Sequence, residues 1–277
     1  NETLSMVRAS RVNTLAQAVA EELGIHVRPE EIRPDSQNPL YRLLYWTQHI
    51  FEGTGRPLTG EQRDKAPPRR SARRTAAGIF VTLFAVYLSN LQYHSSVDNV
   101  ATTFLPFSIA REGNLDLDEF RELLGPGEEA GYLRARGSHV YSANTIITPL
   151  LIAPLYLLPA RWLATHDVPY DDVRAQLLVV VMERLCAAGL IALSASVLWL
   201  VLRRLTPDRR ALLITAIYGL GSSTWAISSQ GLWTHTLSEL SLVVLSAVFL
   251  APTPSPAGLV LAGATAALAV ANRPQMI

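Results

Sequence analysis

A stretch of nineteen residues without a charge, 75–93, follows directly after four arginines and constrains the fold more than any other feature. At about 1.5 Å per residue, a helix of this length crosses the roughly 30 Å hydrocarbon layer of a bilayer. Arginine clusters beside a span stay on the cytoplasmic side, so the group at 69–74 predicts a first span that runs outward. The residues that follow this span would then emerge on the far face of the membrane.

The composition agrees with a chain that changes character at about residue 74. Charged residues make up 17% of the chain and hydrophobic residues 49%, whereas a soluble domain carries about 25% charge. The charges concentrate in residues 1–74, and long charge-free runs occupy residues 75–277. No basic face with interleaved aromatic residues indicates a nucleic-acid partner. The sequence therefore predicts a mainly α, multi-span helical membrane protein with a small helical N-terminal segment.

Residues 1–74 are predicted to hold helices and a linker, and we find no chemistry in them. Apolar residues recur at helical spacing over 10–23, and a second apolar and aromatic run covers 40–51. Residues 53–72 are rich in Gly, Pro and charge, which indicates a linker. These helices form either a small helical domain or an interfacial segment on the membrane. Because the sequence begins with Asn and ends abruptly, we expect a fragment of a longer protein.

The later apolar runs are compatible with two topologies. Residues 141–160 are uncharged but contain three prolines, which remove hydrogen bonds from a helix and bend it. If this run crosses the bilayer, the arginine-rich turn 203–210 falls outside, against the positive-inside rule. If it is re-entrant or lies along the outer interface, residues 177–202 run inward, the arginines are cytoplasmic and the turn 230–235 is external. We prefer the second topology because it keeps both arginine groups on one side.

The preferred topology gathers several polar residues on the outer face. A long polar loop, 94–140, begins with His94 and Asp98 just beyond the first span. In a partly dry cleft, Asp98 could act as a general base or as a metal ligand, and otherwise it is an ordinary interface carboxylate. His139 and His235 map to the same face, and three histidines could bind zinc. They lack a tight ligand spacing, however, which favours separate polar contacts.

Two further polar motifs have alternative interpretations. Asp116 and Asp118 form a D-x-D motif, which holds a metal in soluble nucleotide-sugar transferases, but a lone D-x-D is common by chance and more often decorates a loop. Glu183 and Arg184 lie inside or at the mouth of a span. Ionisable residues in that position pair with groups on neighbouring helices, sit at headgroup level or carry function.

The order of these features along the chain is informative as a set. They are an acid after the first span (96–99), a loop with an Arg-Glu-Gly-Asn-Leu-Asp run (111–116), a Pro-rich hydrophobic stretch (141–156), an arginine-rich turn (202–210), an external Leu-Trp-Thr-His (232–235) and a Gly/Ala-rich span that ends in Asn-Arg-Pro (272–274). Residues 75–277 thereby resemble the GT-C class of membrane glycosyltransferases, which use polyprenyl-phosphate sugars. That class includes protein O-mannosyltransferases and the bacterial aminoarabinose transferases of lipid A.

The resemblance implies transfer of a sugar from a polyprenyl-phosphate donor to an acceptor on the extracytoplasmic face. It makes Asp98 the base that deprotonates the acceptor hydroxyl, and it implies the bilayer, the lipid-linked donor and an unidentified acceptor as partners. A divalent metal held by Asp98 and His235 is a further expectation. Two departures stand out: Asn99 occupies the place of a frequent second acid, and residues 142–144 lack the lysine of the aminoarabinose-transferase type.

The same resemblance suggests which residues contact the donor, and where. We expect donor or substrate contacts from polar residues of the outer face, namely His94, His139, Tyr141, Asn144, His235 and Arg273. Arg134 and Arg136 are alternatives to the missing lysine. The expected location is the bacterial inner membrane, with the N-terminal segment cytoplasmic. The alternatives are a non-catalytic membrane protein, such as a transporter or flippase component or a scaffold, and a GT-C-like pseudoenzyme.

Overall fold

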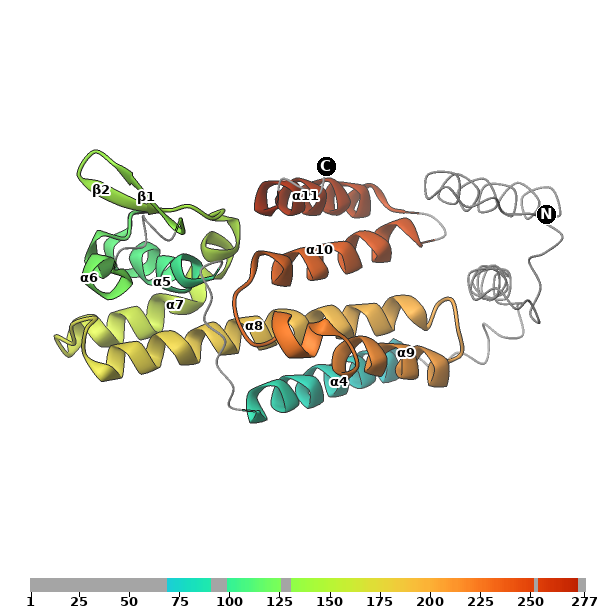
Figure 1. Cartoon of the computed structure of the whole chain (residues 1–277). Coiled ribbons are helices and arrows are strands. Elements are labelled where there is room, and N and C mark those ends of the chain that lie inside the picture. The colour runs from blue at the N-terminus through green and yellow to red at the C-terminus, as the bar shows by residue number, and fades with distance from the viewer. Residues whose placement is uncertain (1–68, 91–98, 126–130, 252–253, 274–277) are drawn as a thin grey trace, which may run out of the picture. The chain divides into compact units, whose positions relative to one another are not determined.

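A computed structural model of the chain describes residues 69–90, 99–125, 131–251 and 254–273 (Figure 1). All of them belong to one compact unit, 67–277. The helices predicted at 10–23 and 40–51 lie outside the described residues, as do His94 and Asp98. The described part is mainly helical, which confirms the predicted α class.

The described elements follow one another in a simple order. They are α4 (Arg69–Ser89), α5 (Val100–Phe107), the π-helix η2 (Ser108–Glu112), the 3₁₀ turn η3 (Asp118–Phe120), α6 (Arg121–Leu124), β1 (Leu133–Arg136), β2 (His139–Ser142), α7 (Ile147–Thr165), α8 (Val173–Leu202), α9 (Asp208–Leu220), the π-helix η4 (Thr224–Ser228), α10 (Thr234–Phe249) and α11 (Pro256–Asn272). Helix α8 has 30 residues and passes through two regions that differ in their packing.

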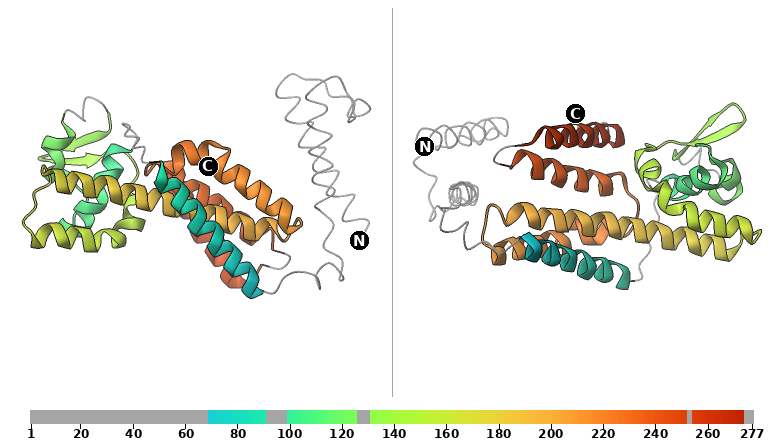
Figure 2. Two further views of the ribbon diagram at one scale, coloured as in Figure 1. Left: turned by 90° about the horizontal axis from the view of Figure 1, so that it is seen from below. Right: turned by 180° about the vertical axis from the view of Figure 1, so that it is seen from behind.

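The first region, called here the bundle region, comprises 69–90, 184–251 and 254–273. Helix α4 runs antiparallel to the second half of α8, and the right view of Figure 2 shows the two helices side by side. Near its start, α4 places Ala72 against Trp199 and Ala211. Near its end, it places Tyr87 beside Ile191. Helix α10 packs on α8, and α11 packs on α10.

This antiparallel order brings both arginine groups to one end of the bundle region, called here the arginine end. Arg73 and Arg74 lie in the first turns of α4, and the 203–210 turn joins the end of α8 to the start of α9. The preferred topology required this arrangement. Helix α4 begins six residues before the predicted span and ends at Ser89. Its arginines therefore belong to the helix and not to a loop before it.

The bundle region buries small and polar side chains and exposes large apolar ones. Its buried polar residues include Ser194, Ser196, Thr215, Thr236, Ser238 and Ser241. Large aliphatic residues are exposed on every one of its long helices, among them Val81, Leu193, Leu213, Leu242 and Val260. Small and hydroxyl residues between helices, with an apolar perimeter, are typical of helices that associate within lipid.

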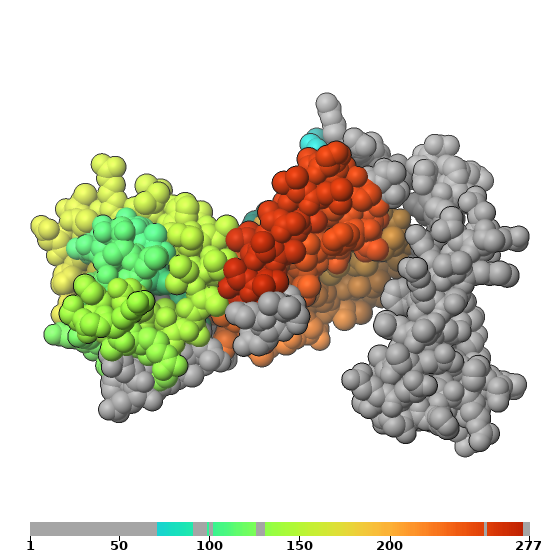
Figure 3. Space-filling view, turned by 90° about the horizontal axis from the view of Figure 1, so that it is seen from above, coloured from blue at the N-terminus to red at the C-terminus, as the bar shows by residue number. Residues whose placement is uncertain are grey.

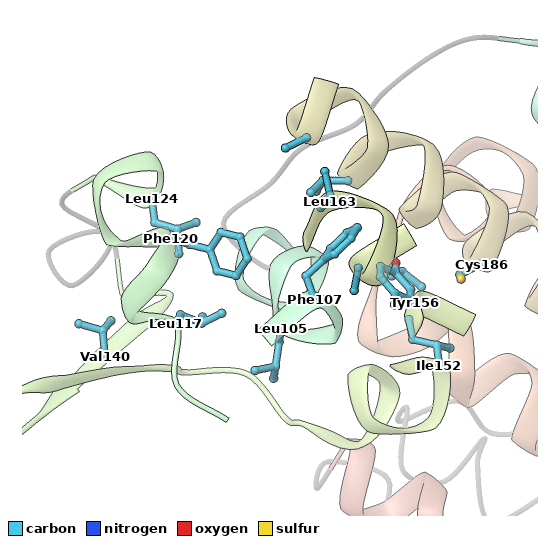
Figure 4. Packing of buried hydrophobic residues seen from close by; sticks show 14 of the residues in the cluster. Leu105, Phe107, Leu117, Phe120, Leu124, Val140, Ile152, Tyr156, Leu163 and Cys186 are labelled. Atoms are coloured by element: carbon cyan, nitrogen blue, oxygen red, sulfur yellow. The ribbon is translucent and has the colours of Figure 1, made fainter. Parts of the chain in front are cut away.

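The second region, called here the outer region, comprises 99–125 and 131–183. The prediction of a polar loop over 94–140 was wrong for its described part, which folds into α5, η2, η3, α6 and the two-stranded antiparallel hairpin β1–β2. Large apolar side chains supply a core that a linker would lack (Figure 4). Phe107 packs edge-on against Tyr156 of α7, with ring centroids 4.9 Å apart.

The proline-rich run is helical over most of its length. Its first residues belong to β2, and the remainder forms one continuous helix, α7, through Pro154 and Pro159. That this run is re-entrant or lies along the outer interface stays a prediction. The helix packs against α5 and η2, whose side chains enclose its inner face. Among the described helices, α7 and α8 are long and apolar enough to cross a membrane, while α10 and α11 are apolar but shorter.

Candidate functional site

Glu183 lies where the two regions meet, and its carboxylate joins three segments of the chain. It belongs to α8 and is fully buried. Its Oε1 accepts a hydrogen bond from Asn99 Nδ2 at 3.0 Å and another from the backbone N–H of Leu232 at 3.0 Å. A buried carboxylate requires such donors because desolvation of an unpaired charge is costly. The residues that meet here, Asn99, Glu183 and 230–235, are called the junction site.

Arg184 makes the corresponding contacts toward α4. Its Nη2 donates to the backbone oxygen of Tyr87 at 2.9 Å and to Asn90 Oδ1 at 3.1 Å. Neighbouring opposite charges on α8 therefore reach the end of α4 and the start of α5. The interpretation that Glu183 and Arg184 pair with neighbouring elements is confirmed.

The turn 230–235 fits closely against these charges. A Cβ at Gly231 would lie 2.7 Å from Asn99 Nδ2 and 3.1 Å from Glu183 Oε1, so a side chain at this position does not fit. Thr102 Oγ1 donates to the oxygen of Leu232 at 3.1 Å. The rings of Trp233 and His235 stack with centroids 5.5 Å apart. The turn thus places an imidazole and an indole beside the junction.

Asn272 connects the end of α11 to the same end of the bundle region. Its Nδ2 donates to the oxygen of Thr234 at 2.6 Å, and its Oδ1 accepts from Thr148 Oγ1 at 2.7 Å. Thr145 Oγ1 donates to the backbone oxygen of Asn272 at 2.8 Å. Figure 3 shows the end of α11 in dark red against the yellow-green segment that leads into α7. Arg273 follows directly and is exposed.

The predicted site residues separate into two groups. His235 and Arg273 lie at the junction end of the bundle region, and Asp98 directly precedes Asn99 in the chain, although Asp98 and His94 are outside the described residues. His139 and Tyr141 lie in β2, and Asn144 follows that strand. The expected alternatives for donor binding, Arg134 and Arg136, are exposed on β1.

His139 belongs to a cluster with the D-x-D motif, and the interpretation of that motif as loop decoration stays a prediction. His139 Nδ1 lies 2.6 Å from Asp118 Oδ2 and 4.0 Å from Asp116 Oδ2. Within the described ranges, these three residues form the group of His, Cys, Asp and Glu side chains close enough to share a metal. His235 is not part of it, so the described histidines do not form a common zinc site.

Hydrogen bonds keep the carboxylate of Asp118 ionised. Partial burial raises its pKa, but the N–H of Val140, His139 and the guanidinium of Arg121 together outweigh that effect and lower the pKa below its ordinary value. Val140 N donates to Asp118 Oδ1 at 2.9 Å and Arg121 Nη2 donates to the same atom at 3.0 Å. Oδ2 is the oxygen that faces His139.

Glu239 of α10 forms a separate polar centre within the bundle region. Its carboxylate accepts hydrogen bonds from Ser228, from Thr224 Oγ1 at 3.0 Å and from the hydroxyl of Tyr218 at 3.0 Å. Ser228 and Thr224 belong to η4, a π-helical turn, and such turns occur frequently at functional sites. The sequence analysis did not predict this polar centre. Its signal in the sequence is a single acid that follows several hydroxyl residues and precedes an apolar run.

No protein-family model matches the sequence, and comparisons with characterised proteins and with solved structures find no match.

Proposed function

We propose that this protein is a glycosyltransferase of the bacterial inner membrane that moves a sugar from a polyprenyl-phosphate donor to an acceptor on the extracytoplasmic face. The observation that carries the proposal is the anchoring of Asn99 by the buried Glu183. This anchoring holds Asn99, which directly follows Asp98, the expected base, in the sequence. It holds Asn99 beside the turn that carries His235.

The membrane placement rests on the bundle region. An apolar perimeter around buried hydroxyl groups suits lipid, and arginine-rich ends stay cytoplasmic. The arginine end would then face the cytoplasm, and the junction site would face outward. The outer region, with its own core and charged hairpin, would stand above the external interface, with the exposed leucines of α7 toward the lipid.

Asn99 is consistent with this chemistry although the GT-C class often has an acid there. Its amide donates to Glu183 Oε1, whereas a carboxylate at position 99 would have no proton to donate and would repel Glu183. Glu183 therefore supplies an acid at the point where the second acid is missing from the local sequence. We assign it a positioning role, because it is fully buried and bonded to two segments.

In the proposed reaction, Asp98 takes the proton of the acceptor hydroxyl as its oxygen attacks the anomeric carbon of the donor sugar. The bond from that carbon to the phosphate oxygen breaks, and the polyprenyl phosphate leaves with the electron pair. A cation beside the departing phosphate would stabilise its charge. Arg273 is exposed at the junction end and is the described residue best placed for that role.

The test is a donor-turnover assay with the chain in native membranes, in which release of polyprenyl phosphate is followed. A general base contributes about 100-fold or more to rate, so Asp98→Asn is expected to lose at least that much transfer. Asp171→Asn, an exposed acid of the outer region, is the matched control and is expected to keep full turnover. Unchanged turnover in Asp98→Asn contradicts the assigned role.

One observation favours a second function, that of a transporter component. The chain between α9 and α10 includes the π-helix η4, whose Thr224 and Ser228 donate, with Tyr218, to the carboxylate of Glu239 in α10. Interrupted helices with polar groups form transport sites. Donor binding and turnover separate the alternatives. Binding without turnover indicates a pseudoenzyme. Absence of both, together with a substrate flux that Glu239→Gln abolishes, indicates transport.

A further inference from the structure

We propose that Asp116, Asp118 and His139 form a binding site for one zinc ion, which clamps the β1–β2 hairpin onto the η3 turn of the outer region. The site uses neither Asp98 nor His235, so it is distinct from the junction site. The proposal does not depend on the transferase reaction.

The backbone brings the three side chains together from two parts of the chain. Asp116 pairs with Tyr141 in an isolated antiparallel bridge, and Leu117 N donates to the oxygen of Val140 at 2.7 Å. Asp118 Oδ1 is held by the N–H of Val140 at 2.9 Å. These bonds fix both aspartates against β2, where His139 projects from the neighbouring position. One ligand atom from each residue lies within 4.8 Å of the other two.

The donor set has the composition that zinc accepts. Zinc binds imidazole nitrogen at about 2.0–2.1 Å and carboxylate oxygen at about 2.0–2.2 Å in tetrahedral geometry, so its ligand atoms lie roughly 3.3 Å apart. His139 Nδ1 is 2.6 Å from Asp118 Oδ2 and 4.0 Å from Asp116 Oδ2, which brackets that spacing. The His139 side chain is 52% exposed and can adjust. The exposed side of the site leaves room for a water molecule as the fourth zinc ligand.

A simple His–Asp ion pair does not account for Asp116. Its side chain is only 15% exposed, yet the protein contacts of its carboxylate are long. Oδ1 accepts from Asp118 N at 3.4 Å, and Oδ2 faces His139 at 4.0 Å. Asp116 is partly buried beside a second carboxylate, so a bound cation would compensate two neighbouring negative charges. Arg121 contacts Asp118 Oδ1 and leaves Asp116 and the other oxygen of Asp118 facing His139.

Imidazole makes the site selective among divalent ions. Magnesium and calcium prefer all-oxygen ligands, whereas zinc takes nitrogen and oxygen together. We therefore expect ZnCl₂ to bind much more tightly than MgCl₂ in the same preparation. Equal binding of the two salts would indicate nonspecific charge attraction and would overturn the zinc assignment.

The experiment is isothermal titration of ZnCl₂ into the full chain, purified in detergent and stripped of metal with a chelator. Asp116→Asn and His139→Asn are each expected to weaken the zinc affinity at least about 10-fold, since each removes a ligand. His166→Asn removes an exposed imidazole elsewhere in the outer region and is expected to change nothing. This control corrects for surface histidines.

A second readout separates loss of binding from loss of fold. Zinc that binds only the folded state raises the melting temperature by mass action. Relative to the same variant in the chelator, we expect ZnCl₂ to raise it in the wild type and in His166→Asn but not in Asp116→Asn or His139→Asn. Variants that still bind zinc as tightly as the wild type, or a wild type that binds none, would overturn the proposal.

Discussion

The bundle region and the outer region are built from one chain but differ in the share of small side chains at their helix contacts. In the bundle region, Ala188, Ala192 and Ala195 allow α8 to approach α4 closely, and large aliphatic residues point away. In the outer region, Phe107 and Phe120 fill the core while charged residues occupy the hairpin surface. The difference lies between the small residues on the second half of α8 and the aromatic residues of the outer region, and α8 belongs to both regions.

The largest expected effect comes from emptying the core of the outer region. Phe107 is fully buried against Tyr156, so Phe107→Ala is expected to lower the free energy of unfolding by about 3–5 kcal/mol. Leu123→Ala, at a partly exposed position of the same region, should cost far less. Thermal unfolding in detergent, followed by tryptophan fluorescence, measures both. Similar losses for the two variants would mean that the outer region lacks a packed core.

Removal of the carboxylate of Glu183 should separate the two regions. Glu183→Ala removes the hydrogen bonds that Glu183 Oε1 accepts from Asn99 Nδ2 and from the N–H of Leu232, at a cost of about 1–3 kcal/mol for each bond lost. Glu183→Gln keeps an oxygen in place and should cost less. Glu122→Ala, an exposed acid, serves as the control. Hydrogen exchange at Leu232 should rise in Glu183→Ala, and unchanged exchange there would contradict the junction.

A methyl group added at the junction site should lower stability, whereas one added in α11 should not. Gly231→Ala places a Cβ 2.7 Å from Asn99 Nδ2, and such overpacking costs about 1–3 kcal/mol. Gly263, inside α11, has nothing within 4 Å of a Cβ. Gly263→Ala should be neutral or stabilising by about 0.5–1 kcal/mol because alanine favours helix. The melting temperature of each variant measures the effect. Shifts in the same direction would contradict the predicted difference between the two positions.

The smallest effect concerns the start of α8, in the outer region. Asp172 accepts hydrogen bonds from the Arg174 side chain and from its N–H, which lower the pKa of Asp172 to about 2. Because the folded-state pKa is depressed, its stabilisation is present above the ordinary Asp pKa of about 3.9 and is lost as the pH falls toward 2. Asp172→Ala should therefore melt lower than wild type at pH 6, with the difference shrinking at pH 2. A difference independent of pH would exclude the charge as its source.

The local sequence pattern predicted the long helices of the bundle region but not the short elements of the outer region. The apolar run 177–202, interrupted by Glu183 and Arg184, predicted most of α8, and the arginine groups predicted the shared end. The contact of Asn99 with Glu183 joins residues 84 positions apart, and no local pattern reports it. His139 meets Asp118 through a hairpin that the sequence did not suggest. The prolines of α7 were expected to bend it, and the helix continues through Pro154 and Pro159 while it packs against α5 and η2.

The most direct test of the account is the side of the membrane on which its two ends lie. Single cysteines at two exposed positions, Arg209→Cys at the arginine end and Arg136→Cys on β1, are introduced into a Cys186→Ser background and treated with an impermeant thiol reagent. We predict that Arg136→Cys in intact cells is labelled from outside and that Arg209→Cys is labelled only after the membrane is opened. Labelling of both positions from the same side would contradict the outward-facing junction and the transferase proposal that rests on it.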